Sequence, residues 1–345
     1  MLYNNLETFF NSAGSDLAVV STYRHATTVA NFEDKVRMQV ISASGSISEI
    51  NLPTVTPYRW GWKNVNSVAQ PMCYFVRSID NLKGQIYYLV FCNGNIGFKS
   101  YIFSLNTTTK MLSTLVETSD MVHNISINQQ DELVYITHRY ESATQDFTYT
   151  LRKYVNNSVI GTVKLSELSG FVFSNVVILQ NQSGEYFVNL FKSAQPVNTY
   201  GFYSFSSKTI KVAPSFTRNI TELFQDSVTK KLYYFSFAPQ QTNMFFNISL
   251  SNFAETKNSE DTRYIYKHQV LGNGIVTKYG QEYNSGPQGH AWISYNEGKS
   301  FKEILNVPLQ TNQILKTINN EYYLLGVNQF SGTRVIASVY KLKAR

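Results

Sequence analysis

The chain of 345 residues contains five histidines, the side chains that most often bind metals or act as general bases near neutral pH. A metal site or a nucleophile site is recognised in a sequence when such side chains stand at fixed short spacings from other ligands or from a nucleophile. None of the five stands at such a spacing, and they are His25, His123, His138, His268 and His290. We therefore predict no metal site and no catalytic residue.

Acidic pairs could also do chemistry, because a glycosidase needs two carboxyl groups about 5 to 9 Å apart. The chain has 23 acidic residues, and several stand in turn-like settings, such as Asp80, Asp131 and Asp226. A clustered pair is not favoured. The glycines at 272 and 274 form a simple turn and are too few for a phosphate-binding loop, so no cofactor is predicted.

One aromatic segment is a candidate contact site for a ligand or a protein partner. It holds two of the three tryptophans within five residues and consists of Tyr58, Arg59, Trp60 and Trp62. Exposed aromatic rings stack on sugars and anchor protein partners. The alternative is that these rings pack inside the fold.

Short runs rich in aromatic and β-branched residues, each closed by Asn, Gly, Ser or Lys, indicate strands throughout the chain. One pattern recurs every 43 to 51 residues, with reference positions at Val40, Tyr87, Tyr135, Tyr186, Tyr233, Tyr279 and Tyr322. A β-strand repeat of this length is typical of a propeller. We predict an all-β fold, a single domain over residues 1–345, with seven four-stranded antiparallel blades.

The chain after Tyr322 has room for only one more strand, TRVIASVYKL. We expect an N-terminal strand, LETFFNS or DLAVVSTY, to complete the last blade and close the ring, which would remove an exposed sheet edge.

Residues 292 to 301 read WISYNEGKSF, which resembles the Asp-box hairpin of sialidase-type propellers. The matching positions are Ser294, Asn296, Gly298, Ser300 and Phe301. We expect Asn296 to bond nearby backbone amides, Gly298 to take a positive φ and Phe301 to pack under the turn. The resemblance implies a structural role, because in that family the box lies away from the catalytic face.

The composition limits the classes of partner. The formal charge is +7, but the basic residues are scattered, so no nucleic-acid partner is predicted. No apolar run is long enough to span a membrane, and the first residues do not have the pattern of a signal peptide. Cys73 and Cys92 are the only cysteines, and we expect them to be small core residues.

Only 15% of the residues are charged, and Tyr, Phe and Asn are abundant. This composition resembles that of bacteriophage virion proteins. It leads us to expect a non-enzymatic virion component, made in the host cytoplasm, that docks other virion proteins and could bind a host-surface glycan or receptor. The alternatives are a sialidase-like glycan-degrading enzyme and an intracellular interaction propeller of WD40 type.

Overall fold

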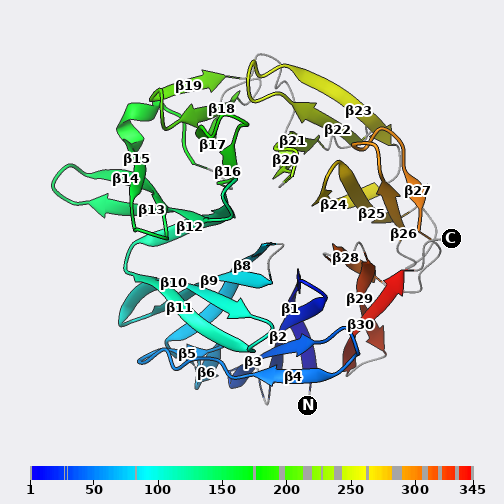
Figure 1. Cartoon of the computed structure of the whole chain (residues 1–345). Coiled ribbons are helices and arrows are strands. Elements are labelled where there is room, and N and C mark those ends of the chain that lie inside the picture. The colour runs from blue at the N-terminus through cyan, green and yellow to red at the C-terminus, as the bar shows by residue number, and fades with distance from the viewer. Residues whose placement is uncertain are drawn as a thin grey trace. The chain divides into compact units, whose positions relative to one another are not determined.

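The computed structural model describes most of the chain and shows it to be built almost entirely of strands (Figure 1). The only helix among these residues is the short 3-10 helix η1 (Leu165–Leu168). The described residues are 2–26, 28, 30–81, 84–173, 176–193, 199–212, 220–226, 228–236, 243–261, 264–281, 290–304, 310–317, 321–330 and 334–342.

The chain folds into two compact units. Unit 1 combines residues 1–125 with residues 313–345, and unit 2 covers residues 126–312. The expectation of one domain stays a prediction. No helix in the described ranges is long and apolar enough to cross a membrane.

Unit 1 contains two sheets from the first part of the chain. The first sheet consists of β1 (Leu2–Ala13), β2 (Asp16–Ala26), β3 (Phe32–Ile41), β4 (Ile47–Ile50), β6 (Lys63–Val65) and β7 (Val68–Ala69). The second consists of β5 (Arg59–Trp60), β8 (Met72–Asn81), β9 (Gln85–Gly94), β10 (Gly97–Asn106) and β11 (Met111–Thr118).

The next two sheets have four strands each. The third sheet consists of β12 (Met121–Ile127), β13 (Leu133–Glu141), β14 (Asp146–Lys153) and β15 (Val159–Lys164). The fourth consists of β16 (Ile178–Gln180), β17 (Tyr186–Lys192), β18 (Thr199–Ser204) and β19 (Thr209–Val212).

The last three sheets follow in chain order. The fifth consists of β20 (Ile220–Gln225), β21 (Leu232–Ser236), β22 (Asn243–Ile248) and β23 (Glu255–Asp261). The sixth consists of β24 (Tyr264–Gly272), β25 (Ile275–Gln281), β26 (His290–Ser294) and β27 (Lys302–Glu303). The seventh consists of β28 (Gln310–Lys316), β29 (Tyr322–Phe330) and β30 (Arg334–Leu342).

The chain has a β-propeller fold with antiparallel four-stranded blades, as the repeat predicts. Each of the seven reference residues lies in a different sheet, five of them in the second strand of that sheet and Val40 and Tyr87 in the third. Six sheets have four or more strands and count as complete blades, one fewer than the seven predicted, whereas three strands are described in the seventh.

The blades are held together by the aromatic strands that define the repeat. In β9 the seven residues from Ile86 to Cys92 are all buried, as are all five residues of β21. A strand buried on both faces needs such a continuous apolar run, because neighbouring sheets cover each face. The largest fully buried side chains include Tyr88, Tyr233 and Trp292.

The ends of the chain meet differently from the prediction. Both segments expected to close the ring lie in the first sheet, where β1 pairs with β2, and the described strand pairs of the seventh sheet include neither. The two sheets meet through side chains instead. Leu17 and Val19 pack against Leu315, and Ser12 Oγ donates a hydrogen bond to the Lys316 carbonyl at 2.9 Å.

The two cysteines are buried as expected, but they form a disulfide, which the sequence analysis did not predict. Cys73 in β8 and Cys92 in β9 are directly opposite each other in an antiparallel pair, with their Cα atoms 4.0 Å apart. Residues in this position have Cβ atoms close enough to be bridged.

Candidate functional site

Trp60, one of the predicted contact residues, is held in the core of unit 1. Its ring stacks on Phe75 with centroids 5.0 Å apart and lies 5.9 Å from Phe103. Its Nε1 donates to the Pro53 carbonyl at 2.8 Å, and the neighbouring Tyr58 is 8% exposed. This environment matches the packing alternative for both rings.

Arg59 and Trp62 have different environments. Arg59 forms an ion pair with Glu33, and this hydrogen bond holds the pKa of the Glu33 carboxyl below its usual range. The Trp62 ring is exposed, lies edge-on to Phe32 and donates through Nε1 to Asn64 Oδ1 at 3.2 Å. Trp62 is therefore the ring of this segment most open to a partner, and its contact role stays a prediction.

The hairpin between β26 and β27 has the local bonds expected for an Asp-box-like turn. Asn296 Oδ1 accepts a hydrogen bond from the Ser300 backbone N–H at 3.0 Å, and Ser294 Oγ accepts one from Gly298 N–H at 2.9 Å. Gly298 has φ +78°, and Phe301 packs against the core of the fifth and sixth sheets. These residues stabilise a turn, and the family resemblance rests on them alone.

Titratable side chains also meet inside unit 2, on the sixth sheet. His268, Lys278 and Trp292 are opposite one another on β24, β25 and β26. Lys278 forms an ion pair with Asp261 on β23 of the fifth sheet, and its Nζ lies 4.0 Å from the Phe301 ring centroid. This ion pair joins the fifth and sixth sheets. Lys278 is only 4% exposed, so solvent does not reach its ammonium group.

His268 is 4% exposed, and its ring centroid lies 3.9 Å from that of Phe235. Burial, together with the nearby Lys278 cation, lowers the pKa of His268 to about 3, so the imidazole is neutral at physiological pH. Its Nδ1 is buried without a hydrogen-bond partner. In the described ranges, no three His, Cys, Asp or Glu side chains converge as metal ligands would.

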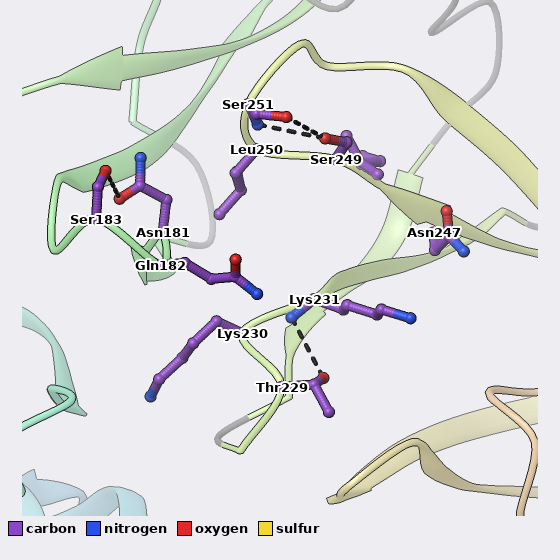
Figure 2. A pocket seen from close by; sticks show the side chains of 11 residues that line it. Asn181, Gln182, Ser183, Thr229, Lys230, Lys231, Asn247, Ser249, Leu250 and Ser251 are labelled. Atoms are coloured by element: carbon purple, nitrogen blue, oxygen red, sulfur yellow. Dashed lines mark hydrogen bonds between the residues drawn. The ribbon is translucent and has the colours of Figure 1, made fainter.

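A polar pocket of about 430 Å³ lies in unit 2 between three turns of neighbouring sheets, and we call it the turn pocket (Figure 2). It is lined by residues 181–183 after β16, residues 229–231 before β21, and residues 247–251 at the end of β22 and in the turn that follows. Figure 2 shows Gln182 and Leu250 pointing toward each other from facing turns. The pocket thus combines amides and hydroxyls with the aliphatic side chains of Ile248 and Leu250.

Hydrogen bonds within the turns fix the pocket's shape. Asn181 Oδ1 accepts from the Ser183 hydroxyl at 2.8 Å and from Glu185 N–H at 2.9 Å. The Ser251 N–H donates to Ser249 Oγ at 3.3 Å. Asx and Ser turns of this kind satisfy backbone groups locally, so the turns are defined without a ligand.

Glutamines join the turns of successive sheets. Gln180 Oε1 accepts from the Gln129 N–H at 2.8 Å, across from the third to the fourth sheet. Gln225 Nε2 donates to the Gln180 carbonyl at 2.7 Å, across from the fifth to the fourth. One wall of the turn pocket is therefore built from two sheets held in register by side-chain amides.

The turn pocket is basic. The lining residues that the structure describes include two lysines and no Asp or Glu. Lys231 forms an ion pair with Glu297, whereas the Lys230 ammonium makes no hydrogen bond or ion pair with any residue that the structure describes. Burial is the main cause that lowers the pKa of Lys230, partly offset by the charges of Asp226 and Asp131. Figure 2 shows the two lysine side chains extending in opposite directions.

The sequence analysis did not single out the turn pocket. Its residues come from the polar turns that separate the strands, NQSG at 181–184 and TKK at 229–231, which were interpreted only as turn signals. Nothing in a linear sequence distinguishes a turn that lines a pocket from one that does not. The pairing of Lys231 but not Lys230 is visible only in the folded chain.

Neither a protein-family model nor a curated protein matches this chain. Solved structures do. The acylaminoacyl peptidase of Pyrococcus horikoshii superposes with a TM-score of 0.61 at 10% identity, over 97% of this chain and 51% of that one. The propeller domain of the Trilobed protease from Pyrococcus furiosus, described as having an open velcro topology, gives 0.57 at 9% identity, over 99% and 97%.

A third neighbour is oligogalacturonate lyase from Vibrio parahaemolyticus, with a TM-score of 0.56 at 9% identity, over 99% of this chain and 96% of that one. The chain spans about half the length of the acylaminoacyl peptidase it matches. At these identities the likeness shows the fold.

The expectation of a non-enzymatic virion protein is contradicted. The structural neighbours include peptidases, the propeller domain of a protease, and a lyase. That expectation rested on amino-acid composition. A propeller needs abundant aromatic strands and uncharged polar turns whatever it binds, so this composition is explained by the fold alone.

Proposed function

We propose that this chain is the propeller part of a peptide-hydrolysing enzyme and that it binds the peptide in the turn pocket. The observation that carries the proposal is the lining of the pocket, which combines amide, hydroxyl and ammonium groups with two aliphatic side chains. The peptidase propellers that share the fold support the reaction class.

The pocket has the groups that an extended peptide needs. Side-chain amides both donate and accept hydrogen bonds, so Gln182 can pair with the N–H and C=O groups of a peptide. Ile248 and Leu250 belong to the core of the fourth and fifth sheets and supply an apolar surface for a side chain of the substrate. Pockets of about this size bind small ligands.

The test is a binding and cleavage assay on a defined mixture of short peptides. Saturable binding of some peptides, measured by calorimetry, and new fragments detected by mass spectrometry support the proposal. Gln182→Ala should weaken binding, because Gln182 is exposed at the pocket. Gln130→Ala is the matched control, since Gln130 is exposed in the corresponding turn of the third sheet, outside the pocket. A folded protein that neither binds nor cleaves any peptide would refute the proposal.

A second candidate is a lyase acting on an acidic oligosaccharide. The observation that favours it is length, because this chain and the Vibrio parahaemolyticus lyase match over nearly all of both. Among the described residues that line the turn pocket there is no aromatic ring, whereas sugar sites commonly use one for stacking. Incubation with oligogalacturonate, followed by ultraviolet absorbance of unsaturated products, tests this candidate directly.

A further inference from the structure

Lys230 is the cation of the turn pocket that is left for a ligand. The other lysine of the lining, Lys231, is already paired with Glu297. Lys230 has neither a hydrogen bond nor an ion pair to its ammonium within the described part of unit 2. An ammonium can donate three hydrogen bonds, so Lys230 has its full donor capacity available.

The nearest acidic group on the same turn is not free to neutralise Lys230. Asp226 is fully buried, and its carboxylate accepts four backbone N–H groups, with distances of 2.7 to 3.1 Å, from Val228, Thr229, Asn273 and Gly274. A carboxylate with its lone pairs occupied in this way is a structural anchor of the turn. Asp226 is therefore engaged by the backbone, whereas Lys230 is one of the residues that line the pocket.

The backbone at Lys230 is fixed. Its N–H donates to the Asp226 carbonyl at 3.0 Å, and its own carbonyl accepts from Gln225 Nε2 at 3.0 Å. Half-burial of the side chain weakens its hydration, which an incoming anion would compensate. The lysine thus starts from a defined position on the pocket wall, and only its side chain has to adjust to a ligand.

We infer that the turn pocket recognises the free C-terminal carboxylate of a peptide, with the Lys230 ammonium donating to it and the aliphatic surface of Ile248 and Leu250 contacting the last side chain. This inference rests on the proposed function, since it names the end of the peptide that the pocket holds. The amide of Gln182, which also lines the pocket, can bond the last peptide groups.

The test uses calorimetry with the full chain and three N-acetylated pentapeptides ending in leucine. One has a free carboxylate, one has a C-terminal amide, and one has the amide plus an internal glutamate. We expect the free acid to bind about tenfold more tightly than either amide, because a charge-assisted hydrogen bond is lost in the amides. Equal binding of acid and amide would overturn the inference, and tight binding of the glutamate peptide alone would assign Lys230 to a side-chain carboxylate.

Lys230→Met should lower the affinity for the free acid about tenfold and leave the affinity for the amide within about twofold. Lys208→Met is the matched control, because Lys208 also sits in a turn of unit 2 with positive φ, 54° against 57°, and lies outside the pocket. If both variants behave alike, Lys230 does not hold the carboxylate.

The outcomes separate the inference from the function on which it rests. If peptides bind with the same affinity whether they end in a carboxylate or an amide, the proposed function stands and the carboxylate site is wrong. If no peptide binds, both are wrong. Binding of trigalacturonate instead, lost in Lys230→Met, would assign the same pocket to an acidic sugar and reject the peptide.

Discussion

Gly298 shows how one residue can secure the contact between two sheets. It has φ +78°, and a Cβ built at this position would lie 2.7 Å from the ring of Phe245 on the fifth sheet. In Gly298→Ala, the alanine has to adopt an unfavourable positive φ, and its Cβ has to displace the Phe245 ring. We expect a loss of about 3 kcal/mol in the free energy of unfolding, measured with urea.

Gly184→Ala provides the comparison for Gly298. Gly184 has φ +85° in another turn of unit 2, but the nearest atom to its added Cβ would be 3.9 Å away, an ordinary contact. This variant should lose only about 1 kcal/mol. Equal losses in the two variants would show that the approach of Phe245 contributes nothing.

His268 should give the protein a pH-dependent stability. Its pKa of about 3 in the folded state is below the ordinary value of 6.5, so the unfolded chain binds a proton that the folded chain does not. Stability is therefore greatest above pH 6.5 and falls as the pH drops from 6.5 toward 3. By linkage, the histidine alone costs about 2 kcal/mol at pH 5.

His268→Phe replaces the imidazole with an apolar ring in a pocket already lined by Phe235 and Phe245. Urea unfolding at pH 5 and pH 7 should show a smaller difference for this variant than for the wild type. An unchanged difference would mean that other groups cause the acid sensitivity.

At the scale of elements, the turn between β20 and β21 is joined to the turn between β24 and β25 through Asp226. Two of the four N–H groups that its carboxylate accepts, those of Asn273 and Gly274, belong to the sixth sheet. Asp226→Asn keeps the shape but replaces one acceptor oxygen with a donor. The free energy of unfolding should fall by about 2 kcal/mol, because buried N–H groups lose their partner.

Asp131→Asn tests whether that loss is specific to Asp226. Asp131 lies in the corresponding turn of the third sheet, but it is exposed. Its substitution should change stability by less than about 0.5 kcal/mol. Urea denaturation of the two variants under the same conditions gives the comparison.

The strand pattern was predictable from sequence because aromatic runs and polar turns are local. Tyr135, Tyr186 and Tyr233 lie in the second strands of three successive sheets, and even the last strand, β30, was expected where it lies. The disulfide was not predictable, because whether Cys73 and Cys92 can be bridged depends on the register of β8 and β9. The turn pocket depends on the way neighbouring sheets meet, which no local pattern contains.

At the scale of the whole molecule, the disulfide belongs to unit 1 only. The loop it closes has a sequence separation of 19 residues, for which the loss of chain entropy in the unfolded state gives about 3 kcal/mol of stabilisation. Replacing both cysteines with alanine should therefore weaken unit 1. Hydrogen exchange measured by mass spectrometry should speed up in β8–β10 and stay unchanged in β21 and β22.

Urea unfolding of the oxidised wild type with and without dithiothreitol is the control for that double variant. The reduced protein should match the variant. Equally faster exchange in both units would show that they unfold together rather than separately.

The meeting of the first and seventh sheets through side chains has a mechanical consequence. In unit 1, β1 is bonded to β2 and β30 to β29, and Ser12 and Leu17 contact the seventh sheet with no strand shared among the residues that the structure describes. A pull applied to the two termini would open a seam of side-chain contacts and unzip each hairpin from its end. It would not have to shear a ladder of backbone hydrogen bonds, so the force needed should be low.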